Sequence, residues 1–441
     1  MKIKKDPKAF YGYAKRFSKT NSDIGPFFCK EGNPITESKE IVEMLRQQYE
    51  SVFSIPLEEK QILNPEEFFS TNDAKETLDN IPFNRKDILE KIDCLSAGAA
   101  SGPDGIPAIL LKKCKHSLVD GLDILFRKLL IDGDLLAMIK HAFVIPIHKG
   151  GSRGLPANFR PVSLTSHIMK TFERVVREVL VCHLEVNQKL NTNQHGFRNR
   201  RSCLSQLLEH HDQILSILEE GHNVDSIYLD FAKAFDKVDK GILCHKLKSI
   251  GISGKLGLFL YNFLSDRKQT VLANGTKSEE STVRSGVPQG TVLGPILFLI
   301  LINDIDIGIS SRISLFADDT RIFKKVDTEN DVEDLQSDLD ELYRWQESNN
   351  MEFNSKKFEI LRYGKNQILK DSTFYLTPQF EEIIEEKESL RDLGVIMTND
   401  CSFSNHVDLV CSKVRQNSGW ICRTFKNRQA WFLKMIWISL V

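Results

Sequence analysis

The stretch Arg-Ile-Ser-Leu-Phe-Ala-Asp-Asp-Thr-Arg-Ile-Phe-Lys-Lys-Val, residues 312–326, decides the fold of this chain. Apolar and polar side chains alternate on both sides of Asp318 and Asp319, a pattern that is typical of two short strands. We therefore predict a β-hairpin whose two-residue tip carries both carboxylates. Because Asp tolerates turn geometry, an Asp-Asp pair by itself is also typical of a plain solvated turn.

A third carboxylate favours a functional role for this pair. Asp230 ends another short apolar run, Ser-Ile-Tyr-Leu-Asp-Phe at 226–231. Carboxylates gathered from different strand ends repel one another unless a hard cation holds them together. The three acids therefore indicate a candidate site for divalent metal ions.

Three motifs occur in a fixed order along the chain: Tyr-Leu-Asp-Phe-Ala-Lys-Ala-Phe-Asp-Lys-Val-Asp at 228–239, Ser-Gly-Val-Pro-Gln-Gly-Thr-Val-Leu-Gly-Pro at 285–295, and Phe-Ala-Asp-Asp at 316–319. Together they resemble the reverse transcriptase of non-LTR retrotransposons of the jockey and chicken-repeat type. The resemblance covers the chain from about residue 7 to the C-terminus. It implies an α+β right-hand polymerase fold with fingers, a palm that contains an antiparallel sheet, and a partial thumb.

The resemblance also implies a catalytic centre. In this family two Mg²⁺ ions, or Mn²⁺ in their place, are held by the residues that match Asp230, Asp318, Asp319 and the carbonyl of Phe231. Lys356 matches a motif lysine and is a candidate general acid for pyrophosphate departure. The next residue, Lys357, stands where the family usually has Thr, so the sequence departs from the family pattern there.

Nucleotide binding is expected at a basic hairpin. A strand at 142–149, a Gly-rich turn and a strand at 158–164 can fold over an anion. Lys149 and Arg160 match fingertip residues that hold the incoming triphosphate, and Arg offers phosphate a rigid fork while Lys acts as a mobile charge. The resemblance places Gln289 against the nascent base pair. A plain surface hairpin is the alternative.

Phe235 is a candidate sugar gate. It lies five residues beyond Asp230, where the chain turns back over the nucleotide pocket. A rigid ring there would leave no room for a 2′-hydroxyl group and would select dNTP over rNTP. The alternative is a core role, since Ala232 and Ala234 beside it are small and apolar.

A concentrated basic stretch indicates a nucleic-acid groove. The net charge of the chain is −1, but residues 140–201 carry eleven Lys and Arg against three Glu. Within this stretch lies a loop that resembles the family's template-facing loop and suits backbone phosphates and base stacking. A basic solvated surface is the alternative. The candidate template- and primer-binding residues are Gly196, Phe197, Arg198, Arg200 and Arg201.

The cysteine pattern and the apolar runs indicate the cellular compartment and argue against a membrane span and a zinc site. The nine cysteines are scattered without a Cys-x-x-Cys motif, which favours a reducing, intracellular compartment, nucleus or cytoplasm. The longest apolar run, 292–302, is too short to span a membrane. Cys401, His406, Cys411 and Cys422 lack the tight spacing of a zinc knuckle.

We divide the chain in sequence order. Thr328 is expected to cap a long helix with a buried apolar stripe, and residues 390–396 resemble the hairpin that grips the primer end. Family members continue beyond the end of this thumb and usually carry an upstream endonuclease. The expected parts are an N-terminal extension with a helix (1–84), fingers with the basic region (85–225), palm (226–365), primer-grip-like hairpin (366–404) and the start of a truncated thumb (405–441).

The sequence therefore predicts an RNA-directed DNA polymerase core that uses an RNA template, a DNA primer and dNTP, and no membrane. One alternative is an RNA-dependent RNA polymerase, which shares the palm carboxylates but normally has a small or polar residue at the position of Phe235. A second alternative is a degenerate or domesticated protein that binds nucleic acid without polymerising. The sequence gives no indication of the oligomeric state.

Overall fold

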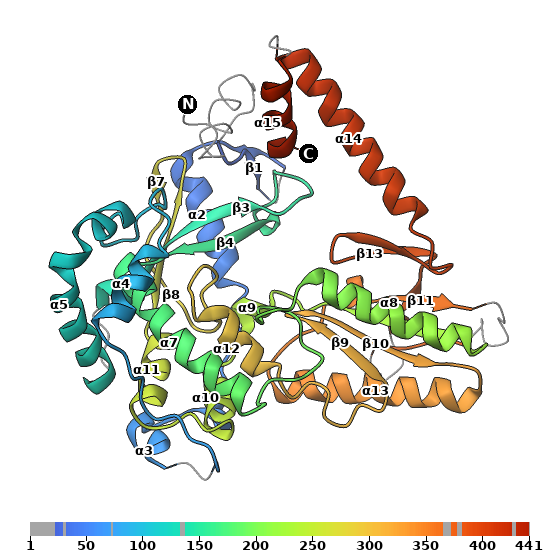
Figure 1. The fold of residues 1–441 in the computed structure, drawn as a ribbon, viewed down its shortest axis with the longest axis horizontal. Coiled ribbons are helices and arrows are strands. Elements are labelled where there is room, and N and C mark those ends of the chain that lie inside the picture. Colours follow the sequence, from blue (N-terminus) through green and yellow to red (C-terminus); the bar gives the residue numbers. More distant parts are fainter. Residues whose placement is uncertain are drawn as a thin grey trace.

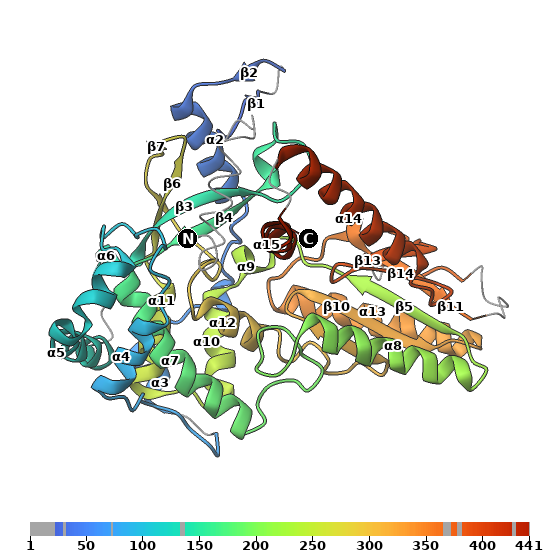
Figure 2. The same cartoon turned by 45° about the horizontal axis from the view of Figure 1, so that its top comes forward.

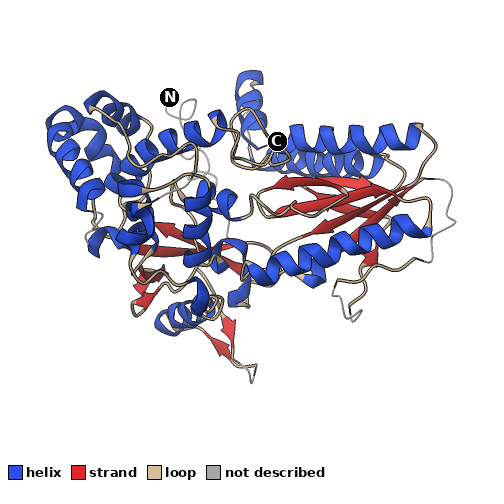
Figure 3. Cartoon of the chain, turned by 90° about the horizontal axis from the view of Figure 1, so that it is seen from below, coloured by secondary structure: helices blue, strands red, loops and turns tan. Residues whose placement is uncertain are grey.

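The computed structural model describes residues 23–29, 32–71, 74–132, 137–364, 372–376, 382–425 and 429–440. Most strands of the described residues form two separate five-stranded sheets with helices around them, and the other strands form two antiparallel two-stranded sheets (Figures 1 and 3). The combination of antiparallel and mixed sheets with helices agrees with the predicted α+β class.

The first sheet, here called the palm sheet, has the strand order β12-β11-β5-β10-β9. Its central strand β5 is buried along its whole length and pairs antiparallel with both β10 and β11. The predicted hairpin is present as β9 and β10. The strands are β5 (Val224–Leu229), β9 (Arg312–Phe316), β10 (Asp319–Lys325), β11 (Glu359–Tyr363) and β12 (Glu385–Glu386).

Two long helices, α8 (Cys203–Glu219) and α13 (Glu329–Ser348), flank the palm sheet (Figure 1). Thr328 caps α13 as predicted, because its hydroxyl accepts from the backbone N–H of Asp331 while the Asp331 carboxylate accepts from Thr328 N–H. The expected apolar stripe of α13 is buried, apart from the half-buried Val332 at its start. This stripe comprises Leu335, Leu339, Leu342 and Trp345.

The second sheet, here called the finger sheet, has the order β4-β3-β6-β7, and β8 also pairs with β6. Helix α2 (Ser38–Glu50) covers it, and four of its side chains share a core with Val144, Phe159 and Val271. The predicted basic hairpin is β3 and β4. The strands are β3 (His141–His148), β4 (Phe159–Leu164), β6 (Lys268–Ala273), β7 (Thr276–Lys277) and β8 (Ser281–Thr282).

The two five-stranded sheets do not follow each other in sequence order. Strands β6 to β8 lie within 226–365, the expected palm, yet β6 pairs in parallel with β3 of the finger sheet. Conversely, α8 lies within the expected fingers but packs on β5 and β9 of the palm sheet. Parallel pairing needs a long crossover connection, so no local sequence signal marks it. The two parts of the fold are therefore interleaved along the chain.

A helical layer connects the two sheets. Within it, α12 is apolar and buried all round, which explains the longest apolar run of the sequence as a core helix. In the described part of the chain, no helix is both long and apolar enough to cross a membrane. The layer contains α3 (Pro65–Ser70), α4 (Arg85–Asp93), α5 (Ala108–Asp132), α6 (Ala137–Lys140), α7 (His167–Val186), α9 (Ala234–Lys237), α10 (Lys240–Ser249), α11 (Gly254–Leu264) and α12 (Gly294–Leu301).

The C-terminal part forms a hairpin followed by two helices. Figures 1 and 2 show α14 leaving the hairpin and α15 folding back beside it. The expected primer-grip-like hairpin is thus present as a structure. These elements are β13 (Ser389–Asp392), β14 (Val395–Thr398), α14 (Ser404–Thr424) and α15 (Ala430–Leu440).

Short elements also occur elsewhere in the described residues. They are the strands β1 (Phe27–Phe28) and β2 (Pro34–Ile35) and the 3₁₀ turns Glu58–Lys60, Pro156–Asn158 and Ser355–Lys357.

A buried ion pair joins β10 to this hairpin. Arg321 Nη2 lies 2.7 Å from Asp392 Oδ1, and the two side chains are only 1% and 4% exposed. Burial raises the pKa of the Asp392 carboxyl, and the Arg321 charge lowers it by less. Arg321 Nε and Nη1 have no hydrogen-bond partner within the described residues. The hydrogen bonds of the Arg321–Asp392 pair therefore do not fully offset the cost of removing both charges from water.

We predict that Asp392→Ala lowers the free energy of unfolding by about 3–5 kcal/mol, because it leaves the Arg321 charge buried and unpaired. The double variant Arg321→Met/Asp392→Leu should recover most of this loss, because it removes both charges. Urea denaturation of the parent and the two variants measures both effects. A double variant no more stable than Asp392→Ala would show that the two side chains are not energetically coupled.

Candidate active site

The pairing of β5 with β10 brings the predicted carboxylates together. Thr320 pairs with Leu229, so the next pair along the same register sets Asp319 opposite Asp230. Asp319 is the first residue of β10 and pairs with Phe316 across the hairpin. The two-residue turn is therefore Ala317 and Asp318, one residue earlier than predicted. Asp318 lies in the turn, and Asp319 lies on the strand.

A neighbouring segment holds this turn in place. Ala317 has a positive φ of 54°, which a non-glycine residue rarely adopts. Its backbone N–H donates to Gln194 Oε1 at 2.9 Å, and Gly196 N–H donates to the same oxygen at 2.7 Å. A Cβ atom at Gly196 would lie 2.4 Å from the backbone nitrogen of Ala317. Gly196, which we expected at the template, is thus buried against the carboxylate turn.

The electrostatics of the three acids fit a cation site. Burial raises the pKa of Asp318, and the Asp230 charge raises it further, while Arg160 and Lys357 lower it. Burial, then the charges of Asp318 and Asp230, raise the pKa of Asp319 to about 6. A positive charge placed among these oxygen atoms would relieve both penalties. Carboxylate oxygens are also the ligands that Mg²⁺ prefers.

The carboxylates do not form a closed protein cage for a metal ion. In the described part of the chain, no three His, Cys, Asp or Glu side chains converge closely enough to hold a metal by themselves. The ammonium of Lys357 contacts Asp230 Oδ2 and neutralises part of the charge. Mg²⁺ usually binds through one or two carboxylates together with substrate phosphates, so an open donor set suits it.

Lys357 is the lysine at the carboxylates, whereas the sequence predicted Lys356. Both belong to a 3₁₀ turn immediately before β11. Glu359 pairs with Tyr228, and both Lys357 and Asp230 lie two residues from that pair on their own segments, so they share a face of the sheet. Lys356 lines a neighbouring cavity of about 290 Å³, which Asp230, Asp319 and Lys357 also line. No strand periodicity in the sequence distinguishes Lys357 from Lys356, because both lie in the 3₁₀ turn.

A cavity of about 440 Å³ collects the predicted nucleotide-binding residues around the carboxylates. Burial lowers the pKa of Lys149, and the charges of Lys357 and Arg160 lower it further. Four cationic and four acidic side chains thus line one cavity. Its lining contains Lys149, Arg160, Asp230, Phe231, Phe235, Gln289, Asp318, Asp319 and Lys357, together with Pro161, Lys233, Ala234 and Asp236.

Phe235 both lines this cavity and packs on the core. Its ring stacks on Phe298, with centroids 4.6 Å apart and an interplanar angle of 19°. The ring of Phe197 meets it edge-on at 6.3 Å. The position of Phe235 thus leaves both interpretations open, because it lines the cavity and also stacks on a core ring.

The arginines of the expected template loop differ in environment. Arg198 turns inward, where its guanidinium donates to both carboxylate oxygens of Glu185 at 3.0 and 2.6 Å and to the Asn191 carbonyl at 2.7 Å. Arg201 Nη1 lies 2.6 Å from His195 Nε2. Arg200 is exposed, as is the neighbouring ring of Phe197. Arg198 is thus committed to an internal ion pair, an interaction that sequence reasoning missed.

Comparison with known proteins defines the class to which this fold and site belong. Residues 147–397, more than half of the chain, match the family model described as reverse transcriptase (RNA-dependent DNA polymerase). The chain belongs to the reverse transcriptase family, whose members use divalent metal ions.

Its relatives come from mobile elements. It is 28% identical over 342 residues to the probable RNA-directed DNA polymerase from transposon X-element of Drosophila melanogaster, covering 76% of this chain and 37% of that protein. It is 26% identical over 336 residues to the RNA-directed DNA polymerase from mobile element jockey of Drosophila funebris, covering 74% and 36%. The predicted resemblance to jockey-type elements is confirmed. The chain spans little more than a third of these relatives.

Among solved structures, the chain is similar to apo telomerase from Candida tropicalis truncated from the C-terminal domain. The TM-score is 0.41 and the sequence identity is 13%, over 65% of this chain and 59% of the telomerase chain.

Proposed function

We propose that this chain is an RNA-directed DNA polymerase core that joins dNTP to the 3′-hydroxyl of a DNA primer on an RNA template. The observation that carries the proposal is the single cavity in which three carboxylates face Lys149, Arg160 and Lys357. Carboxylates suit the metal ions, and the cations suit a triphosphate. The names of its relatives support the same reaction.

In this proposal Asp230, Asp318, Asp319 and the Phe231 carbonyl hold two Mg²⁺ ions, which Mn²⁺ can replace. Bound there, the ions supply Lewis-acid chemistry that lowers the pKa of the primer hydroxyl group and stabilises the leaving pyrophosphate. The carboxylates orient the reacting atoms, because the β5–β10 register fixes their spacing.

The remaining residues of the cavity bind the nucleotide. Lys149 and Arg160 lie on the β3–β4 hairpin, where Lys149 N–H donates to the Asn158 carbonyl and keeps the hairpin closed. They would hold phosphate oxygens. Lys357 lines the cavity and is better placed than Lys356 to donate the proton that pyrophosphate needs. Phe197, Arg200 and Arg201 would contact the template–primer.

Two alternatives are separated by one assay. Purified protein is incubated with poly-rA, oligo-dT, Mg²⁺ and labelled dTTP, and primer extension is measured. Extension with dTTP supports the proposal. Incorporation of ribonucleotides in preference would favour an RNA-dependent RNA polymerase, and binding of the template–primer without extension would favour a non-polymerising nucleic-acid-binding protein. None of the nine cysteines forms a disulfide bond, which agrees with an intracellular location.

We predict that Asp318→Asn abolishes primer extension but leaves template–primer binding largely intact. Asn keeps the side-chain volume and one oxygen but loses the charge that would anchor the metal ions. Extension rates and filter binding on the same preparations measure the two effects. Asp120→Asn on the exposed surface of α5 serves as the matched control and should behave like the parent. Extension by Asp318→Asn at the parent rate would refute the two-metal assignment.

We predict that Arg200→Ala/Arg201→Ala weakens template–primer binding for all sequences alike. Removal of each arginine that pairs with a phosphate group should reduce the slope of log K against log salt by about 0.7–0.9. Binding titrations at several salt concentrations measure the slope. Arg198→Ala is the internal control, because its partner is Glu185: it should lower the melting temperature and leave the slope unchanged. A slope that changes only in Arg198→Ala would reverse our assignment of these arginines.

We predict that Phe235→Val raises the efficiency with rNTP relative to dNTP. Forcing an extra group into a packed site costs roughly 1–3 kcal/mol, which corresponds to about 5–150-fold discrimination that the smaller side chain would relax. Single-nucleotide incorporation with each sugar measures kcat/KM. Phe126→Val, a fully buried phenylalanine of α5, should lower stability and affect both sugars equally. The same rejection of rNTP in Phe235→Val and the parent would assign Phe235 to the core alone.

A further inference from the structure

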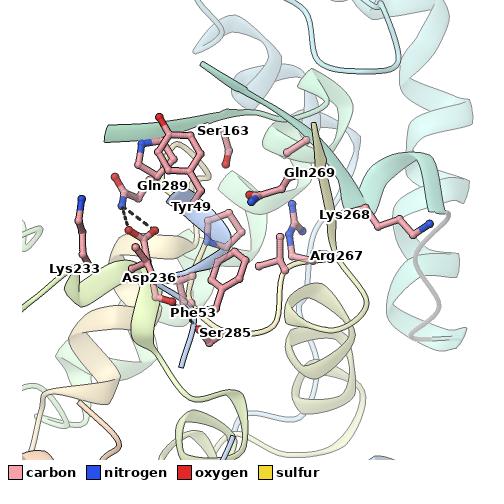
Figure 4. A pocket seen from close by; sticks show the side chains of 17 residues that line it. Tyr49, Phe53, Ser163, Lys233, Asp236, Arg267, Lys268, Gln269, Ser285 and Gln289 are labelled. Carbon is pink, nitrogen blue, oxygen red and sulfur yellow. Dashed lines mark hydrogen bonds between the residues drawn. The ribbon is translucent and has the colours of Figure 1, made fainter. Parts of the chain in front are cut away.

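Gln289 is fixed between the finger sheet and α9. Its backbone carbonyl accepts from Ser163 N–H of β4 at 2.7 Å. Its side-chain Nε2 donates to both carboxylate oxygens of Asp236, at 3.1 and 3.2 Å, as the dashed lines of Figure 4 show. Asp236 belongs to the first sequence motif, but sequence reasoning gave it no role. Both side chains line the nucleotide cavity.

The loop that carries Gln289 is clamped on α9 by its backbone as well. Val287 N–H donates to the Phe235 carbonyl at 2.8 Å, and the Ser285 hydroxyl donates to the Asp236 carbonyl at 2.8 Å. Gly286 has a φ of 93°, and a Cβ there would lie 2.8 Å from both carbonyl oxygens. The loop therefore cannot slide along α9, and the amide of Gln289 stays within reach of Asp236.

Chemistry fixes the polarity of that hydrogen bond. An ionised carboxylate only accepts hydrogen bonds, so it binds the NH₂ end of a primary amide and repels the carbonyl end. With Nε2 on Asp236, the amide carbonyl oxygen of Gln289 is the end left for other partners. A neutral side chain at 236 would impose no such preference. The identity of residue 236 thus decides which polar atom Gln289 offers to the nucleotide cavity.

The Gln289 hydrogen bond and the Lys233 charge offset part of the burial penalty of Asp236. Asp236 and Gln289 also line a second cavity of about 40 Å³, enough for roughly three water molecules (Figure 4). Three buried donors that line this cavity, Tyr49 Oη, Arg267 Nη2 and Gln269 Nε2, lack a hydrogen-bond partner within the described residues. Burial raises the pKa of Asp236 to about 6, against the Gln289 hydrogen bond and the Lys233 charge, so the carboxylate is ionised at pH 8.

We propose that Asp236 is a positioning residue that orients the Gln289 amide so that its carbonyl oxygen faces the incoming nucleotide. This inference rests on the proposed polymerase function, because it assigns a nucleotide to the cavity. The oriented oxygen is an acceptor for a hydrogen-bond donor of the nucleotide. Loss of Asp236 should therefore weaken nucleotide binding and leave template–primer binding unchanged.

A double-mutant cycle at pH 8 tests the proposal. Asp236→Ala should raise KM for all four dNTPs roughly ten-fold, the lower end expected for a hydrogen bond to a charged group, with a smaller change in kcat. Asp236→Asn should raise KM less, because Asn can present either its oxygen or its NH₂ group to Gln289. If Asp236 acts only through Gln289, then Asp236→Ala/Gln289→Ala should match Gln289→Ala. Asp120→Ala, on the exposed surface of α5, is the control.

A binding measurement separates this inference from the proposed function. The dissociation constant of a fluorescent dATP analogue is measured on the protein–template–primer complex with Ca²⁺, which requires no catalysis. If the parent binds the analogue but does not extend primers, the polymerase proposal fails while the variants still test Asp236. If the parent does not bind the analogue at all, both proposals fail.

Two results with Asp236→Ala would overturn the role of Asp236 itself, and Asp236→Asn decides if that variant does not fold. The first is a parent-like dNTP affinity in Asp236→Ala with a lowered melting temperature, which would make it a structural residue only. The second is a double variant whose loss equals the product of the single losses, since this shows independent action. If Asp236→Ala does not fold, the isosteric Asp236→Asn decides: a raised KM supports the proposal and a parent KM refutes it.

Discussion

The antiparallel register between β5 and β10 is the constraint on which the rest of the site depends. Because Thr320 pairs with Leu229, Asp319 follows opposite Asp230 and the turn residue Asp318 projects beside them. A slip of one residue would send each side chain to the other face of the sheet and separate the carboxylates. The fold resists such a slip, since one face of β5 packs with the stripe of α13 and the other with α8.

The carboxylates are close enough to repel, so the surrounding structure must hold them. Gln194 accepts from two backbone N–H groups and fixes the strained turn, while Gly196 leaves the space that the turn occupies. Lys357 offsets part of the charge. None of these interactions satisfies all three acids, and burial together with the charges of Asp318 and Asp230 raises the pKa of Asp319 to about 6. A site that is stabilised in this incomplete way is suited to bind a cation and phosphate groups together.

Local signals in the sequence predicted the helices and hairpins of the site, but they did not predict the pairing between strands that are far apart in the chain. The β9–β10 hairpin, the capped helix α13 and the β3–β4 hairpin each have a periodic pattern or a capping residue within a short window. The parallel pairing of β6 with β3 joins segments more than a hundred residues apart and has no such signal. A division of the chain in sequence order cannot represent this pairing, because it assigns β3 and β6 to different parts. Lys357 was missed because a 3₁₀ turn changes the alternation just before β11.

Counting charges along the sequence overstated the basic surface. The excess of positive charge in 140–201 suggests a groove in which every arginine meets a phosphate. Yet Arg198 is paired with Glu185, and the acids of the same stretch are themselves paired with cations or buried, as Glu173 is between the backbone N–H groups of Val292 and Leu293. Side chains that hold the fold together cannot also neutralise phosphates. The cations left for nucleic acid and nucleotide are those that face a cavity or solvent, Lys149 and Arg200 among them. Burial and pairing therefore decide which basic residues are available for binding, and both depend on the tertiary structure.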